Sequence, residues 1–136
     1  MKIVKGLAIA VLVYVGIVAA FESMIGTLQP QAGSTLVITT RSEEGASHDR
    51  VVSRLESGGA LYVAANHWPR AWYGRLLANP EVQVTLDGAK GDYRAVAVEA
   101  GSEEHLRVAS DNPVPGWFRF VTGFPPRLFV RLEPRA

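Results

Sequence analysis

The part of the chain richest in side chains that could bind or react lies at residues 66–75, "NHWPRAWYGR". It holds two of the three tryptophans, together with a tyrosine, a histidine and two arginines. Flat rings can stack on a planar ligand, and an arginine beside the free N–H groups of a helix N-terminus can bind phosphate or carboxylate. The segment therefore predicts either a site for a flat, anionic ligand or a corner of the core with a polar rim.

Each candidate in this segment has a structural alternative. Arg70 and Arg75 both fit solvated helix charges, the default on a surface helix. Arg70 is the better candidate anion ligand, because it falls in the first turn of the expected helix. His67, at a strand end, is the candidate proton donor, although a lone histidine there is more often a hydrogen-bonded structural residue. Trp68 and Trp72 either stack on a ligand or cap the core.

Composition excludes several classes of protein. The 136 residues suffice for one domain, and 14 basic against 13 acidic residues argue against a nucleic-acid partner. The absence of cysteine rules out disulfides, thiolate nucleophiles and cysteine metal sites. The histidines have no metal-ligand spacing, so no metal site is expected, and no Gly-X-Ser-X-Gly motif supports serine hydrolysis.

The N-terminus predicts a membrane anchor over residues 1–25, followed by a linker over 26–33. An uncharged run from Gly6 to Phe21 would make a helix of roughly 24 Å. With its aliphatic flanks, this run approaches the ~30 Å hydrocarbon core of a bilayer. We therefore expect a single-pass N-terminal anchor.

Two questions about this anchor stay open. Val18-Ala19-Ala20 is a tolerable cleavage site, so a signal peptide is the alternative. Lys2 and Lys5 favour a cytoplasmic N-terminus, which would put the domain on the other side, but two lysines do not decide that side.

Residues 34–136 predict one mainly β (α+β) domain. The expected strands are 34–41, 50–56, 60–66, 81–86, 92–100 and 127–133, and the expected helices are 70–78, 102–110 and a short turn at 117–121. Most connections have hairpin length, and 81–86 with 92–100 is the strongest hairpin, turning through 87–91. This order predicts an antiparallel sheet that curls into a small barrel with short covering helices.

Four phrases point to a family: "LVITTR" at 36–41, "DRVV" at 49–52, the stretch at 62–88 that contains "ANPEVQV", and "YRAVAVEA" at 93–100. Through them the chain resembles the deazaflavin-dependent nitroreductase family of the split β-barrel group. The resemblance covers most of residues 34–134. It implies an antiparallel split β-barrel, a bound deazaflavin, and two-electron reduction of a nitro compound or a quinone.

The resemblance also implies a cofactor site along the loop after the first strand, the start of the second strand and the end of the third. The cofactor-binding residues predicted by this correspondence and by the charges nearby are Arg41, Arg50, Val51, Val52, Ala65, Asn66, Arg70 and Trp72, with Val51 and Val52 lining the ring through their backbone. His67 and Tyr73 are the candidate catalytic residues, and Trp72 and Tyr73 would wall the side where a flat aromatic substrate stacks.

One departure from the family concerns the cofactor. The loop after the first strand reads "RSEEG", with Glu43 and Glu44 where family members carry basic residues. Carboxylates there repel an anionic cofactor tail. Two functions therefore stay open: a membrane-anchored oxidoreductase using deazaflavin or flavin mononucleotide (FMN), or a non-catalytic split-barrel binding module that has lost the cofactor. A homodimer is a further open expectation.

Overall fold

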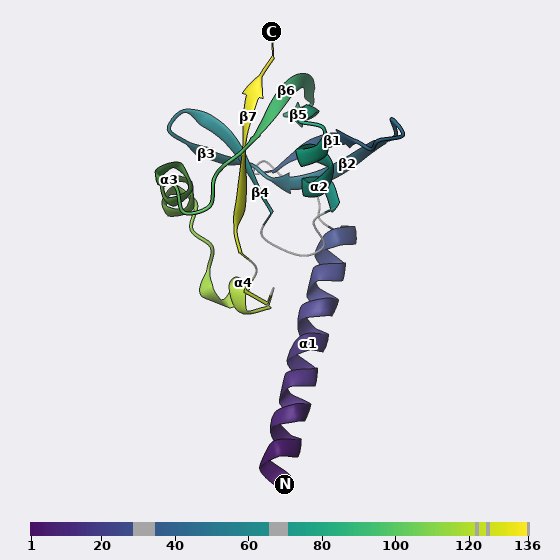
Figure 1. The fold of residues 1–136 in the computed structure, drawn as a ribbon, viewed down its shortest axis with the longest axis vertical. Helices are drawn as coiled ribbons and strands as arrows, with labels where there is room; N and C mark the ends of the chain where they lie inside the picture. The colour runs from purple at the N-terminus through teal and green to yellow at the C-terminus, as the bar shows by residue number, and fades with distance from the viewer. Residues whose placement is uncertain (29–34, 66–70, 122, 125, 136) are drawn as a thin grey trace. The chain divides into compact units, whose positions relative to one another are not determined.

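The computed structural model describes residues 1–28, 35–65, 71–121, 123–124 and 126–135, with only the backbone at 25–28. Its elements are α1 (Lys2–Leu28), β1 (Thr35–Arg41), β2 (Ser47–Ser53), β3 (Leu55–Ser57), β4 (Ala60–Ala65), α2 (Ala71–Ala78), β5 (Glu81–Leu86), β6 (Ala89–Ala97), α3 (Glu103–Asp111), α4 (Gly116–Val121) and β7 (Leu128–Pro134) (Figure 1). One compact unit contains α1 and α4, and a second contains the strands with α2 and α3.

The second unit is built on a seven-stranded sheet in the order β2-β1-β5-β6-β7-β4-β3. Neighbouring strands are antiparallel throughout. The sheet curls so far that β2 approaches β4, although four strands lie between them in the hydrogen-bonded order (Figure 1). This confirms the predicted antiparallel split β-barrel with short covering helices.

The strand predicted at 50–56 is wrong in one respect, because it is two strands. β2 pairs with β1, with Val51 opposite Val37, whereas β3 pairs with β4, with Leu55 opposite Tyr62. Arg54 lies at the break between them. Because β2 and β3 form the two edges of the sheet, one short stretch of sequence serves both edges, and its local pattern does not reveal the change of partner.

The predicted hairpin of β5 and β6 is confirmed, but its turn is tighter than 87–91. Asp87 and Gly88 have φ of 50° and 83°, the left-handed backbone that a two-residue type I′ turn requires. Residues 89–91 therefore continue the ladder, with Ala89 opposite Leu86.

The core lies on both faces of the sheet. Along β4, Val63 and Ala65 belong to the inner cluster, whereas Tyr62 and Ala64 belong to the outer one. This alternation buries β4 on both faces, as expected of a strand that is apolar throughout. The inner cluster consists of Leu36, Ile38, Val52, Val63, Ala65, Trp72, Leu76, Val82, Val84, Ala95, Val130 and Leu132.

Helix boundaries follow the sequence signals closely. α3 is capped by Ser102, whose Oγ accepts a hydrogen bond from the His105 N–H at 3.2 Å, as the serine and following glutamates predict. α4 confirms the short helix expected at 117–121. α1 continues to Leu28, so the first three residues of the expected linker are helical.

Candidate functional site

The candidate site is the inner face of the sheet where β1 meets β2. Successive side chains of a strand alternate between faces, and directly paired residues share a face. On β1, Ile38 and Thr40 are fully buried. Their partners on β2 are Arg50 and His48. A half-buried arginine therefore projects from the inner face, and that face opens to solvent at the exposed His48.

Helix α2 adds a second guanidinium group to this face. Trp72 and Leu76 are buried in the inner cluster. Arg75 lies on the flank of the same helical face, and its Nε donates to the Thr40 Oγ1 at 3.0 Å. The Thr40 hydroxyl in turn donates to the His48 carbonyl at 3.5 Å. Thr40 thus fixes Arg75 on the face from which Arg50 projects.

Two of the predicted cofactor residues project from the opposite face. Arg41 is exposed and pairs with Ser47, and Val51 pairs with Val37. On this outer face, the Thr39 hydroxyl donates to the Asp49 carboxylate at 2.6 Å. The structure therefore does not bring the side chains of Arg41 and Val51 together with Arg50.

The other predicted residues divide between the core and the part of the chain that is not described. Val52 and Ala65 are buried on the inner face. Trp72 is only 4% exposed, and its ring contacts the half-buried Tyr73 edge to face, with centroids 6.1 Å apart. Four further candidates, Asn66, His67, Trp68 and Arg70, lie outside the described residues.

Sequence analysis missed Thr40 as a site residue and assigned Arg75 to solvent. A signal for Arg75 was present, because it lies three residues after Trp72 and directly before Leu76. Residues at such spacing flank the buried face of a helix. No local pattern, however, predicts that α2 packs on β1.

The acidic loop is an exposed turn between β1 and β2. Glu43 and Glu44 are exposed in a turn closed by hydrogen bonds of 2.9 Å between Ser42 and Ala46 and between Gly45 and Ser42. In water two charges 4 Å apart interact by only about 1 kcal/mol. Repulsion by these glutamates is therefore weak compared with the attraction of an arginine that is partly withdrawn from solvent.

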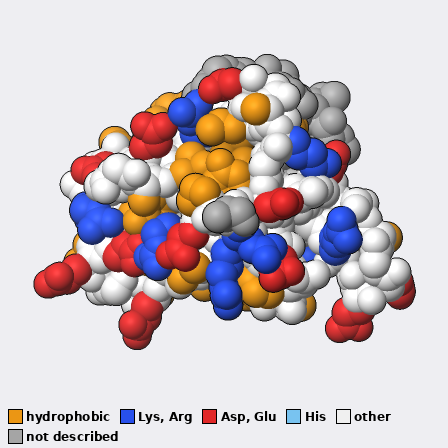
Figure 2. Space-filling model, turned by 90° about the horizontal axis from the view of Figure 1, so that it is seen from above, with side chains coloured by type: hydrophobic (Ala, Val, Ile, Leu, Met, Phe, Trp, Pro, Cys, Tyr) orange, Lys and Arg blue, Asp and Glu red, His pale blue; other side chains and the backbone are white. Residues whose placement is uncertain are grey.

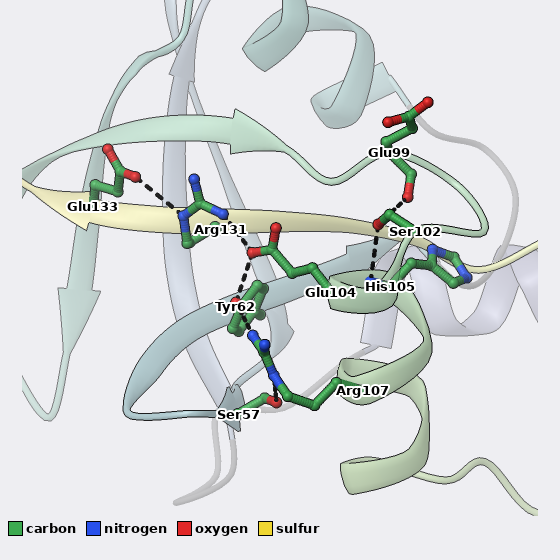
Figure 3. Close-up of polar contacts among 9 residues, drawn as sticks. All are labelled: Ser57, Tyr62, Glu99, Ser102, Glu104, His105, Arg107, Arg131 and Glu133. Atoms are coloured by element: carbon green, nitrogen blue, oxygen red, sulfur yellow. Dashed lines mark hydrogen bonds and ion pairs between the residues drawn. The ribbon is translucent and has the colours of Figure 1, made fainter.

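A second polar cluster lies on the outer face, under α3 (Figure 3). The buried Tyr62 hydroxyl donates to Glu104 at 2.8 Å and accepts from Arg107 at 3.1 Å. Arg107 also donates to the Ser57 hydroxyl at 3.0 Å. Arg131 on β7 completes the cluster by an ion pair with Glu104. These bonds join α3 to three strands.

Protonation in this cluster suits a structural clamp better than proton transfer. The hydrogen bond from Arg131, reinforced by that from Tyr62, lowers the pKa of Glu104 below its usual value. Burial, reinforced by the hydrogen bond to Glu104, raises the pKa of Tyr62. At neutral pH the first stays ionised and the second stays protonated, so neither is set to exchange a proton.

The clamp predicts a pH-dependent stability. Because its pKa is lower in the folded state, Glu104 stabilises the fold above its unfolded pKa, about 4.3, and this contribution is lost as pH falls through the folded value. At pH 7, Glu104→Gln should lower the free energy of unfolding by about 1–3 kcal/mol. Urea unfolding between pH 7 and pH 3 should show the two proteins converging in acid.

The matched control for this prediction is Glu103→Gln, an exposed glutamate in the same helical turn. It should change the free energy of unfolding by less than about 0.5 kcal/mol. A loss at Glu104 that is the same at every pH would contradict the proposed ion pair.

A hollow of about 830 Å³ lies on another part of the sheet. Figure 2 shows hydrophobic side chains gathered at the centre of one face, with charges of both signs around them. In the hollow, Arg54 pairs with Glu56 at 3.0 Å and with Asp87 at 3.4 Å. Arg131 pairs likewise with Glu133 at 3.0 Å. Since these arginines already face carboxylates, the hollow gives little preference for an anionic ligand.

Comparison with known proteins assigns the chain to a family. The sequence profile of the F420H(2)-dependent quinone reductases matches residues 12–124, most of the chain. The chain belongs to this family. The assignment confirms the resemblance to deazaflavin-dependent enzymes. The match begins within α1 and ends three residues after α4. No curated protein matches the chain significantly.

Solved structures share the fold. HutZ, the heme storage protein from Vibrio cholerae, is 20% identical over 78% of this chain and 84% of its own, with a TM-score of 0.59. The F420-H2 dependent reductase FDR-A is 20% identical over 72% of this chain and 93% of its own, with a TM-score of 0.52. A protein described as a domain-swapped dimer is 21% identical over 74% of this chain and 80% of its own, with a TM-score of 0.56. At such identities the likeness shows the fold alone.

Proposed function

We propose that this protein binds reduced deazaflavin on the inner face of its half-barrel and uses it to reduce a flat quinone or nitro compound. The observation that carries the proposal is the placement of Arg50 and Arg75 on the same face, with Arg75 held by Thr40. Membership of the reductase family supplies the reaction class.

The residues present fit an anionic, ring-shaped cofactor. Two guanidinium groups on one face can bind phosphate or carboxylate groups through charge-assisted, two-pronged hydrogen bonds. Buried apolar residues beside them, including Ala65 and Trp72, keep water from the inner wall. The cofactor, when bound, supplies the hydride, while the chain binds it, orients it and excludes water.

The proposal also assigns roles to candidate residues at positions 66–70, which the structure does not describe. Arg70 would add a third cationic group, and Asn66 would line the ring at the end of β4. His67 would give a proton to the reduced substrate, and the half-buried Tyr73 would wall the substrate side. FMN is the alternative cofactor, since its phosphate would meet the same arginines.

We further propose that α1 is a retained membrane anchor. Residues 2–24 are long and apolar enough to cross a bilayer, with a mean hydropathy of 2.4. The Tyr14 hydroxyl donates to the Phe120 carbonyl at 2.8 Å. Cleavage after Ala20 would remove Tyr14 and this contact. An anchor would also bring the enzyme to quinones dissolved in the membrane.

Two alternatives follow from particular observations. The acidic Glu43 and Glu44 favour a binding module without a cofactor, because the family resemblance implies basic residues in this loop. The domain-swapped structural neighbour supports a homodimer, whose presence would be seen as a doubled mass in detergent-corrected light scattering.

A turnover assay tests the proposed function. Full-length protein in lipid nanodiscs is mixed with reduced deazaflavin and either menadione or nitrobenzene, and reoxidation of the cofactor is followed by absorbance. We expect reoxidation faster than in the same mixture without protein, because the bound pair is held together and in orientation. Cofactor binding without faster cofactor reoxidation by either acceptor would contradict the proposed reaction, and absence of cofactor binding would favour the binding module.

A further inference from the structure

The segment that contains α4 packs along one face of α1. The rings of Tyr14 and Phe120 lie 4.9 Å apart, in addition to their hydrogen bond. Phe21, two turns further along α1, contacts Phe118 edge to face with centroids 5.9 Å apart. The segment therefore packs along the C-terminal half of α1.

Gly123 allows this close approach. Its φ of 78° is a left-handed conformation, and a Cβ at this position would lie 3.1 Å from a methyl group of Val18. Any other residue would therefore be strained and would push the turn away from α1. Glycine at this position therefore suits the close packing of the segment on α1.

The same segment leaves its largest apolar side chains exposed. Trp117 is 65% exposed, Phe120 52% and Phe124 55%. Arg119 is the one charged residue of the sequence between 113 and 125. Aromatic groups exposed together mark an interaction surface. They adjoin, in the same compact unit, a helix whose apolar side chains are also exposed.

The depth of this packing fits a lipid interface. The contacts on α1 extend from Tyr14 to Phe21, about 10 Å along the helix axis. The apolar run ends at Phe21, where Glu22 and Ser23 follow. Interfacial protein segments bury their apolar faces ~5–10 Å into the boundary of headgroups and acyl chains. Tryptophan and tyrosine are enriched at that level.

Several backbone polar groups of the segment are hydrogen-bonded within the unit that it forms with α1. The Phe124 N–H donates to the Arg119 carbonyl at 2.8 Å, and the Gly123 N–H donates to the Phe120 carbonyl at 3.3 Å. The Phe120 carbonyl also accepts a hydrogen bond from the Tyr14 hydroxyl. Without this bond the hydroxyl would have no partner among the described protein groups at that depth of the bilayer. Such internal pairing is what a low-dielectric surrounding demands, and the long side chain of Arg119 can reach the headgroups.

We propose that residues 114–121, 123 and 124 form a membrane wedge: they insert beside α1 into the leaflet nearest the C-terminal end of that helix, with Trp117, Phe120 and Phe124 in contact with lipid. The proposal rests on the proposed anchoring of α1 and goes beyond it, since an anchor needs no second inserted segment. The occupant of this aromatic surface is the bilayer itself.

The test uses single cysteines, which the cysteine-free chain makes unambiguous. Full-length Trp117→Cys and Phe124→Cys, each carrying a nitroxide label, are placed in phosphatidylcholine vesicles. Ile9→Cys on α1 and Lys90→Cys, an exposed position on β6, are the lipid and water references. We expect oxygen to relax the labels at 117 and 124 more than a water-soluble nickel complex does, as at 9, and the contrast to reverse at 90.

The outcomes separate the wedge from the anchor. Labels at 117 and 124 that behave like the one at 90, with 9 in lipid, would overturn the wedge and leave the anchor intact. A water-like label at 9 as well would overturn both. Gly123→Leu, combined with the label at 124, should shift that label toward the water reference, because the turn can no longer approach Val18.

Discussion

Replacing Arg50 by alanine should weaken binding of the deazaflavin cofactor by roughly ten- to a hundredfold. A hydrogen bond to a charged group contributes about 1.5–3 kcal/mol, and each 1.4 kcal/mol is about tenfold in affinity. Arg50 projects from the inner face, where Arg75 and Thr40 also lie. Equilibrium titration of full-length protein, followed by cofactor fluorescence, measures the change.

Three variants make this test specific. Arg94→Ala removes an exposed arginine of β6, in the same sheet, and should leave the affinity unchanged. Arg50→Lys should recover only part of the affinity, since an ammonium group lacks the planar fork of a guanidinium. Arg41→Ala should have a much smaller effect than Arg50→Ala, because its side chain projects from the other face. Equal affinities for the Arg50→Ala and Arg94→Ala proteins would remove Arg50 from the site.

Trp72→Ala should lower the free energy of unfolding by about 3–5 kcal/mol, the usual cost of truncating a buried large aromatic side chain. Trp72 is 4% exposed and packs with Leu76 in the inner cluster. Urea unfolding in detergent, read by circular dichroism, gives the value. The matched control is Trp117→Ala, which removes the same side chain from an exposed position and should cost less than about 0.5 kcal/mol.

The result at Trp72 also decides between its two interpretations. A large loss of stability means that the indole is packed in the hydrophobic core and supports the site without contacting the ligand. A loss no larger than that of Trp117→Ala would show that the indole is not packed in the core, and a ligand-stacking role would then be favoured.

Much of the fold follows from local patterns. The alternation of β5 and β6 with Asp87-Gly88 between them specifies the hairpin, and Ser102 with its following glutamates specifies the start of α3. Such signals depend only on neighbours in the sequence. They predicted the antiparallel half-barrel correctly.

The parts that escaped prediction depend on contacts distant in sequence. The change of partner at Arg54 is decided by which strand lies at each edge of the sheet. The position of Arg75 depends on the packing of α2 against Thr40. The contact between Tyr14 and Phe120 joins residues 106 apart. Patterns confined to one element carry no information about these choices.

The central claim is that the inner face binds a deazaflavin, and a cofactor titration tests it most directly. Full-length protein in nanodiscs would be titrated separately with deazaflavin and with FMN. We predict saturable deazaflavin binding that Arg50→Ala weakens and Arg94→Ala does not. Absence of deazaflavin binding to folded wild-type protein would contradict the account. Saturable binding of FMN alone would then reassign the cofactor, and binding of neither would favour the non-catalytic module.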